Sequence, residues 1–321
     1  MRNINWGVLG TAGIARKQTI PGMLEAEGCR LYAIAGRNPE KVQQFQTTFG
    51  FEKAYFCYED LLSDPLVEAV YIPLPNSLHR EWTMKALRAG KHVLCEKPLA
   101  PTYEEARELF EAAKQAGVLL MEAFAYLHSP YLPALRQDLE RIGGLTHLEA
   151  AFLTGTPRPD NIRMDKSLAG GSQYDLGCYC TSLLTALTEE EPCQVKASSL
   201  FDDQGIDLVT TALVAYPSGA TACLRSGMCL GKEGRYDSLY IRGPRGCIRS
   251  DVCFNQPGEL RWTVETPEGT EEHTVTALQN YRLEVESLNR FLVYGETPAV
   301  TPEFSLRNAR LMDAILHSAG Y

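Results

Sequence analysis

Short apolar runs recur along the first third of the chain and predict buried strands. The segments between them space their apolar residues like helices, and Gly90 and Gly117 follow two of these helices as C-terminal signals. Thr102 and Glu105 form a capping box that predicts the start of the helix ended by Gly117. Repeated alternation of strand and helix predicts a parallel, doubly wound sheet. The apolar runs cover residues 5–9, 31–35, 69–73, 92–95 and 118–121.

The pattern changes after Glu122. Predicted strands now follow one another with little helix between them, joined by turn-forming residues at 217–219 and 243–246. We therefore expect an α+β region with a large, open, mostly antiparallel sheet, closed by helices at 281–294 and 305–318. The predicted strands cover residues 145–153, 208–216, 220–225 and 238–242.

A glycine-rich turn follows the first apolar run. Gly10-Thr11-Ala12-Gly13-Ile14-Ala15 matches G-x-G-x-x-G/A except that Ala12 replaces the second glycine. Between two predicted strands, such a turn brings backbone amides and a helix N-terminus toward a pyrophosphate. This predicts a dinucleotide-binding domain of the Rossmann type, with the phosphate path displaced slightly outward at Ala12.

The end of the second strand bears on the choice of cofactor. An acid that would hold a 2′-hydroxyl is missing, because Gly36 occupies its place. Arg37 and Lys41 put two cations there instead, and a guanidinium can pair with a 2′-phosphate. The alternative is a solvated surface pair. We expect NADP(H) to be preferred, with NAD(H) as a possible second cofactor.

Two domains are expected from these patterns. Residues 1–122 would bind the dinucleotide, and residues 123–321 would bind substrate and mediate oligomerisation, with the C-terminal helices free to pack back on the first domain. The open sheet is expected to expose Leu, Val and Ala on one face. Pairing of two such faces predicts a homodimer through residues 145–260, or a dimer of dimers. A monomer with a polar outer face is the alternative.

Composition excludes several function classes. The chain has 321 residues, of which 45% are hydrophobic and 22% charged, as expected for a globular enzyme. A net charge of -9 without a basic stripe argues against a nucleic-acid partner. Because neither a signal peptide nor a membrane-spanning run is recognised, we expect a cytoplasmic protein. The ten cysteines form no C-x-x-C pair, so reduced thiols and no metal are expected.

Lys97 follows a predicted strand within Cys95-Glu96-Lys97-Pro98. Ligands of open α/β sheets bind at the carboxyl ends of strands, and Pro98 stops the strand there. A desolvated lysine amine at this place has a lowered pKa and can work in catalysis, and a cis Lys97–Pro98 bond would fix its geometry. The alternative is an ordinary surface lysine.

Asp175 and Tyr179 lie four residues apart after Gly170-Gly171, which places them on one face of a predicted helix. A phenol beside a lysine ammonium ionises more easily, and it could pass a proton to or from a substrate hydroxyl. Asp175 would then orient that hydroxyl or the lysine. The alternative is a structural role for both residues.

Four motifs occur in one order and together closely resemble the glucose–fructose oxidoreductase/inositol dehydrogenase (Gfo/Idh/MocA) family over the whole chain. Inositol dehydrogenases usually carry His at the position of Tyr179. The chain therefore looks more like the subgroup of NADP-dependent D-xylose 1-dehydrogenases and trans-dihydrodiol dehydrogenases. The motifs are Gly10-Thr11-Ala12-Gly13-Ile14-Ala15, Pro75-Asn76-x-x-His79, Gly90-Lys91-His92-Val93-x-x-Glu96-Lys97-Pro98 and Gly170-Gly171-x-x-x-Asp175-x-Gly177-x-Tyr179.

The resemblance implies roles for individual residues. Lys97 and Tyr179 would be the catalytic pair, with Asp175 assisting. The residues implied to line the cofactor are Gly10, Thr11, Ala12, Gly13, Ile14, Arg37, Lys41, Asn76, His79, Glu96 and Lys97.

One departure from the subgroup concerns the substrate. Dihydrodiol dehydrogenases carry Trp where Ala125 stands, so an aromatic diol would lose a stacking wall and a sugar is favoured. The polar and aromatic groups expected near the substrate are Tyr126, His128, Arg163 and Tyr281. The alternatives are a structural His128 and a core position for Tyr281.

The sequence thus predicts an NADP-dependent oxidoreductase that moves a hydride between nicotinamide and a sugar or sugar-like alcohol. Three alternatives remain open at this point. One is trans-dihydrodiol dehydrogenase activity, and another is a nucleotide-sensing binding protein on the same fold. The third is a transferase-like or hydrolytic enzyme that oxidises its substrate transiently and keeps the cofactor bound.

Overall fold

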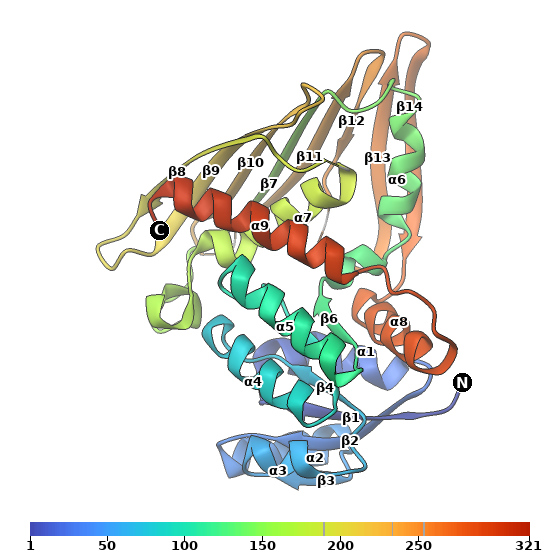
Figure 1. Cartoon of the computed structure of the whole chain (residues 1–321). Coiled ribbons are helices and arrows are strands. Elements are labelled where there is room, and N and C mark those ends of the chain that lie inside the picture. Colours follow the sequence, from blue (N-terminus) through green and yellow to red (C-terminus); the bar gives the residue numbers. More distant parts are fainter. Residues whose placement is uncertain (189, 233, 253) are drawn as a thin grey trace. The chain divides into compact units, whose positions relative to one another are not determined.

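The computed structural model describes residues 1–188, 190–232, 234–252 and 254–321 (Figure 1). The chain divides into two compact units, each discontinuous in sequence. The first comprises Met1–His128 and Leu278–Pro302, and the second comprises Ser129–Ala277 and Glu303–Tyr321. The domain boundary expected between residues 122 and 123 stays a prediction. Among the helices of the described residues, none has the length and apolar character needed to span a membrane.

The first unit is built on a six-stranded, fully parallel sheet with the order β3-β2-β1-β4-β5-β6. This order confirms the predicted doubly wound Rossmann sheet. The shortest strand, β3, was not predicted, because its three residues are only half-buried or exposed. The strands are β1 (Ile4–Leu9), β2 (Cys29–Ala35), β3 (Lys53–Tyr55), β4 (Ala69–Ile72), β5 (His92–Glu96) and β6 (Leu120–Ala123).

Helices of the first unit begin and end close to the predicted signals. Thr102 accepts a hydrogen bond from the Glu105 amide at 3.3 Å, and Gly117 ends the same helix in the left-handed conformation. Within this unit α4 packs on α5 (Figure 1), and α1 packs on α8. The elements are η1 (Ala15–Thr19), α1 (Ile20–Glu25), α2 (Pro39–Phe49), α3 (Tyr58–Ser63), α4 (Asn76–Arg88), α5 (Tyr103–Ala116), η2 (Ala125–His128) and α8 (Asn280–Tyr294).

The second unit is built on an eight-stranded sheet with the order β14-β13-β12-β11-β7-β10-β9-β8. All neighbours are antiparallel except the central pair of β7 and β10. This confirms the predicted mostly antiparallel sheet. The strands are β7 (His147–Thr154), β8 (Gln194–Phe201), β9 (Asp207–Ala215), β10 (Thr221–Met228), β11 (Arg235–Gly243), β12 (Gly246–Ser250), β13 (Gly258–Thr266) and β14 (Gly269–Ala277).

One face of the eight-stranded sheet is covered by helices of the same unit (Figure 1). Helix α7 is buried along its whole length and packs on β7 and β10. Ser318 of α9 accepts a hydrogen bond from the Ala197 amide in β8 at 2.9 Å. The helical elements are α6 (Tyr131–Leu139), η3 (Ile162–Met164), η4 (Lys166–Leu168), η5 (Gln173–Gly177), α7 (Cys178–Leu187) and α9 (Pro302–Ala319).

The opposite face of this sheet is more polar than the sequence pattern predicted. Leu213 on β9 is 60% exposed, as expected for an apolar outer row. The strand register, however, continues that row through Cys223, Glu149, Tyr240 and Arg249, so charged and aromatic side chains alternate with apolar ones. The expectation of a face rich in Leu, Val and Ala was therefore wrong for the middle of the sheet.

Candidate active site

Lys97 belongs to the first unit, whereas Asp175, Tyr179 and Arg163 belong to the second. Each group is therefore described in the surroundings that its own unit gives it. The first unit holds the predicted cofactor residues, and the second holds the predicted phenol.

The glycine-rich turn has the backbone that a close approach requires. Gly10 has a φ of +117° and donates its amide to Ala35 O at 2.8 Å, which ties the turn to the end of β2. A Cβ atom built on Gly10 would lie 3.0 Å from Leu74 Cδ2, whereas one built on Gly13 would meet nothing within 4 Å. The open space beside Gly13, at the start of a helical stretch, fits a phosphate group.

Ala12 stands where the G-x-G-x-x-G/A pattern has its second glycine. Thr11 and Ala12 are half-buried, and Ile14 is exposed at the margin. Ala12 O is already a helical acceptor, because the Arg16 amide donates to it at 3.1 Å. The amides that follow Ala12 therefore belong to the first helical turn, where backbone donors have no partner within the helix.

Gly36, the residue after β2, stands where an NAD-binding domain usually has an acid. A Cβ atom on Gly36 would lie 2.8 Å from Val42 Cγ2, so an aspartate or glutamate would require Val42 to move. Arg37 is exposed and stands beside Tyr58. Burial raises the pKa of Tyr58, and the Arg37 guanidinium lowers it in part. The Tyr58 hydroxyl in turn lies 3.7 Å from the Cβ position of Gly10.

Lys41 occupies the first turn of α2, which starts directly after this strand. The Asn38 side chain caps the helix by accepting the Lys41 amide at 3.0 Å. Arg37 and Lys41 are thus held on a short, capped connection between β2 and α2. Both side chains are exposed, so a phosphate could reach them without displacing packed atoms.

Lys97 follows β5 directly, and its bond to Pro98 is cis, as expected from the sequence. The Leu99 amide donates to Glu122 Oε1 at 2.9 Å, so a buried carboxylate on β6 holds the loop after Lys97. Glu122 was not predicted to have this role. A single acid inside an apolar strand could have indicated it, because a buried carboxylate needs a hydrogen-bond donor.

His79 was expected to line the cofactor, but its side chain is fully buried. Its Nδ1 atom lies 2.7 Å from Pro98 O and its Nε2 atom 2.8 Å from Leu74 O. Burial lowers the pKa of His79, and the charge of Lys97 adds to this effect. The histidine therefore links the Lys97–Pro98 loop to the turn before Asn76, which is half-buried at the start of α4.

Glu96, the residue before Lys97, ends a buried chain of polar groups. Tyr71 on β4 donates its hydroxyl to Glu96 Oε1 at 2.5 Å, and its oxygen lies 2.8 Å from Thr19 Oγ1. All three side chains are buried. Glu96 thus serves the packing around β5, and a direct contact with a cofactor stays a prediction.

Glu284 on α8 is a buried acid that the sequence analysis did not single out. Neither carboxyl oxygen has a hydrogen-bond partner among the described residues. Burial raises the pKa of Glu284 well above its usual value, and the negative charge of Glu96 raises it further. Both effects favour the protonated, neutral form of the carboxyl.

Three of the residues expected near the substrate lie in the first unit. Tyr126 and Tyr281 are 3% and 6% exposed, His128 is half-buried, and η2 packs on α8. Burial lowers the pKa of His128 to about 4, and its Nε2 atom has no hydrogen-bond partner within the described residues. His128 is thus a neutral histidine in this structure, and its contact with substrate stays a prediction.

The helix type changes between Asp175 and Tyr179. Asp175 lies in the π-helical turn η5 and Tyr179 in the first turn of α7, so the simple α-helical spacing expected from the sequence does not hold. Arg163, from η3, donates its Nε to Asp175 Oδ2 at 2.5 Å. Asp175 raises the pKa of Arg163, and Tyr179 raises it further.

The phenol of Tyr179 lies in an aromatic pocket of the second unit. Its ring centre is 5.6 Å from that of Phe152 and 5.2 Å from that of Phe254. The phenol oxygen accepts a hydrogen bond from Asn255 Nδ2 at 2.8 Å. The residue is 8% exposed, so its ring is packed among aromatic side chains while its hydroxyl accepts the Asn255 amide. Asn255 belongs to none of the motifs recognised in the sequence.

The glycines before Asp175 are required by the local packing. A Cβ atom on Gly171, which has a φ of +116°, would lie 2.0 Å from Asp207 Oδ1. The other Asp207 oxygen accepts the Ser172 hydroxyl at 2.7 Å and the Gln173 amide at 2.8 Å. This buried carboxylate therefore fixes the start of the segment that carries Asp175 and Tyr179.

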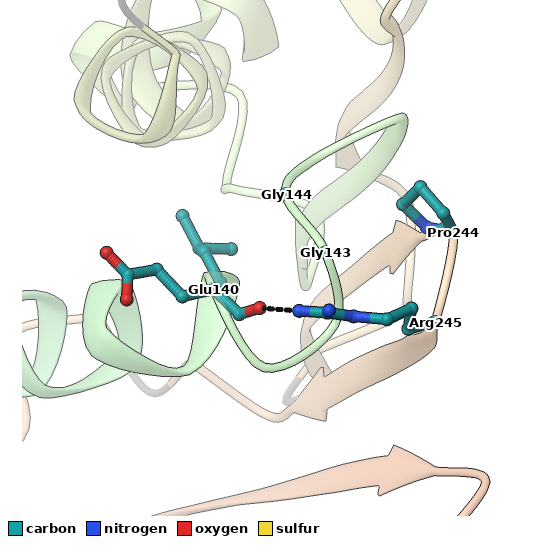
Figure 2. A pocket seen from close by; sticks show the side chains of 6 residues that line it. Glu140, Gly143, Gly144, Pro244 and Arg245 are labelled. Atoms are coloured by element: carbon teal, nitrogen blue, oxygen red, sulfur yellow. Dashed lines mark hydrogen bonds between the residues drawn. The ribbon is translucent and has the colours of Figure 1, made fainter.

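A hollow of about 530 Å³ lies elsewhere in the second unit, and none of the predicted site residues lines it. Figure 2 shows Arg245 reaching the main chain of Glu140, where its Nη2 donates to the carbonyl oxygen at 2.5 Å. The arginine is thereby engaged by the protein itself. The hollow is lined by Leu139, Glu140, Gly143, Gly144, Pro244 and Arg245.

Two family models match the chain. Residues 4–124 match an oxidoreductase family with an NAD-binding Rossmann fold, and residues 137–249 match the GFO/IDH/MocA C-terminal domain. A D-xylose 1-dehydrogenase (NADP(+)) from Haloferax volcanii is 36% identical over 98% of this chain and 97% of its own length. A trans-1,2-dihydrobenzene-1,2-diol dehydrogenase from Xenopus laevis is 29% identical over 98% of both chains.

A solved structure has the same fold over nearly the whole chain. It is a 3-ketoreductase from Actinomadura kijaniata in complex with NADP and TDP-benzene. The TM-score is 0.93 at 31% identity, and the match covers 99% of this chain and 98% of the reductase.

Proposed function

Because the chain belongs to the GFO/IDH/MocA family of NAD(P)-dependent oxidoreductases, we propose that it transfers a hydride between NADP and a sugar or keto-sugar. The observation that carries this proposal is the position of Lys97. It follows the carboxyl end of β5 in a Rossmann sheet, on a loop fixed by Glu122 and His79.

The cofactor site is assigned to the turn after β1 and the connection after β2. Gly10 allows the tight turn and Gly13 leaves open space for the pyrophosphate, and Arg37 and Lys41 supply the charges for a 2′-phosphate. The packing of Gly36 against Val42 supports NADP over NAD, because it leaves no room for an acid. Asn76 and Lys97 complete the set at the ends of the neighbouring strands.

When bound, the nicotinamide accepts or supplies the hydride. The proton is handled by this chain's own residues. During oxidation of an alcohol, Tyr179 in its ionised form takes the hydroxyl proton, and during reduction the phenol returns it. Lys97 is assigned to the same proton transfer by its motif, and within the second unit the Arg163–Asp175 pair holds a cation near the phenol.

The substrate class is proposed as an aldose or a keto-sugar. Relatives named for D-xylose and for ketoreduction support it, and Ala125 in place of a tryptophan disfavours an aromatic diol. Arg163 is the side chain assigned to a substrate oxygen, since 43% of it is exposed. The buried Tyr126 and Tyr281 and the half-buried His128 are proposed to shape the site.

A homodimer is proposed through the open face of the eight-stranded sheet, within residues 145–260, with a dimer of dimers as its extension. Glu189, Glu233 and Cys253 of that range lie outside the described residues. The exposed Leu213 on β9 supports a contact at this face.

A substrate panel tests the proposed function. D-xylose, other aldoses, a keto-sugar and a trans-dihydrodiol are each incubated with NADP(H) and NAD(H), and the absorbance of the reduced nicotinamide is followed. We expect turnover on an aldose or keto-sugar and faster turnover with NADP(H). Turnover on the diol alone would reassign the substrate. Tight NADP binding without turnover on any compound would favour a nucleotide sensor.

A further inference from the structure

Asn255 lies in the connection between β12 and β13 and has the left-handed backbone conformation, with a φ of +60°. Asparagine tolerates this conformation better than most residues with a side chain. The conformation accompanies a specific contact, since Nδ2 lies 2.8 Å from the Tyr179 hydroxyl oxygen. The Oδ1 atom is buried and has no hydrogen-bond partner within the described part of the chain.

The direction of this hydrogen bond has a chemical consequence. An amide NH₂ group donates, so the phenol oxygen accepts and its own proton points elsewhere. A donor stabilises a phenolate more than a neutral phenol, because the bond to an ionised acceptor is the stronger one. An accepting atom at the same place would have the opposite effect.

We propose that Asn255 is a positioning residue that directs the Tyr179 hydroxyl and favours its ionised form. This inference rests on the proposed function for its role in turnover, but its effect on the phenol does not. The phenol can act as a base only while it is ionised. A hydrogen-bond donor at its oxygen therefore raises the fraction of enzyme in which Tyr179 can take the substrate proton.

Two ion pairs near the aromatic cluster of Tyr179, Phe152 and Phe254 are held by contacts that do not involve Asn255. Arg163 and Asp175 approach from η3 and η5, as an ion pair at 2.5 Å. Arg235 and Asp237, on β11, form a second pair at 2.5 Å. Arg235 also lies over the Phe152 ring and donates to Phe254 O at 3.1 Å, so it holds the segment next to Asn255.

Two substitutions separate the donor from the backbone conformation. Asn255→Gly keeps the left-handed conformation and removes the amide. Asn255→Asp keeps the shape and replaces the donor by a carboxylate, which repels a phenolate. Gln256→Ala is the matched control, because this exposed neighbour lies in the same connection.

Ultraviolet difference titration of tyrosinate, taken as each protein minus its Tyr179→Phe counterpart, measures the ionisation of Tyr179 without cofactor or substrate. The chain contains 15 tyrosines, so this subtraction is needed. We expect the midpoint to rise by about one pH unit in Asn255→Gly, as for loss of one bond to a charged group. The rise should be larger in Asn255→Asp and absent in Gln256→Ala.

The basic limb of the pH profile for alcohol oxidation should move in the same direction. Unchanged titration midpoints in both Asn255 variants would overturn the inference. Midpoints that fall would also overturn it, because they would mean that the Asn255 amide accepts a hydrogen bond from the phenol. If Tyr179→Phe retained wild-type turnover, the proposed proton transfer would fail instead. The titration would still decide the role of Asn255.

Discussion

The Nε atom of Arg163 lies 2.5 Å from Oδ2 of Asp175. The carboxylate expected to assist catalysis is thus bonded to the arginine expected to contact the substrate. The pair joins a turn of η3 to the π-helical turn that precedes Tyr179. Asp175 therefore acts on the site at least partly by holding Arg163.

Asp175→Asn should lower kcat/KM by about tenfold to a hundredfold, as for loss of one charge-assisted hydrogen bond. Steady-state kinetics on the best sugar measures the effect. Arg158→Ala is the control, since Arg158 and Asp160 form an exposed pair close by in sequence. Equal losses in the two variants would contradict a specific role for the Asp175 pair.

Arg37→Ala should weaken NADP binding by roughly 1.5–3 kcal/mol, because it removes a charge-assisted bond to the 2′-phosphate. NAD binding should change much less. Calorimetric titration of both cofactors measures the difference. The control is Arg30→Ala, which removes an exposed cation on β2, the strand that precedes Arg37. Equal losses of affinity for NADP and NAD would mean that Arg37 does not contact the 2′-phosphate.

Glu284→Gln should stabilise the protein at neutral and alkaline pH. The folded chain keeps a proton on Glu284 above pH 4.5, whereas the unfolded chain releases it. The wild type therefore loses stability as pH rises toward the raised folded pKa, by up to about 1.4 kcal/mol per pH unit.

Glutamine stays neutral and removes this dependence, so the advantage of Glu284→Gln should grow with pH. Urea unfolding at several pH values measures it. Glu303→Gln, an exposed acid at the start of α9, is the control and should show no such trend. A constant difference between Glu284→Gln and wild type from pH 5 to pH 8 would mean that Glu284 is ionised in the folded protein.

Light scattering should give a mass of about twice the 35.6 kDa chain or a multiple of it. Leu213→Arg should shift the protein toward the monomer, because an unpaired charge would be buried in the proposed contact. Leu66→Arg changes a similarly exposed leucine of the first unit and should leave the mass unchanged. A wild-type mass near 35.6 kDa would reject the dimer.

The fold was predictable where local pattern and burial agree. The apolar runs of β1, β2, β4 and β5 and the Thr102 cap are local signals, and the structure confirms them. Strand β14 was not predicted, because its Glu and Thr side chains are largely exposed at a sheet edge. The break in helix type at Asp175 was also missed, since periodicity does not separate a π-helical turn from an α-helix.

The candidate site residues were proposed from motifs, whereas contacts between distant segments could not be predicted. Lys97 and Tyr179 stand in recognisable motifs. The partner of the phenol, Asn255, lies 76 residues from Tyr179 and belongs to no motif. Likewise, the buried carboxyl of Glu284 meets the charge of Glu96 only because α8 returns to the first unit.

The central claim is that Tyr179 and Lys97 carry proton transfer in an NADP-dependent oxidoreductase. Single-turnover hydride transfer on the best sugar, at saturating NADP, measures it most directly in wild type, Tyr179→Phe and Lys97→Ala. The account predicts that each variant loses about a hundredfold or more in rate, while Tyr179→Phe still binds NADP as tightly as wild type. A wild-type rate in Tyr179→Phe would contradict it.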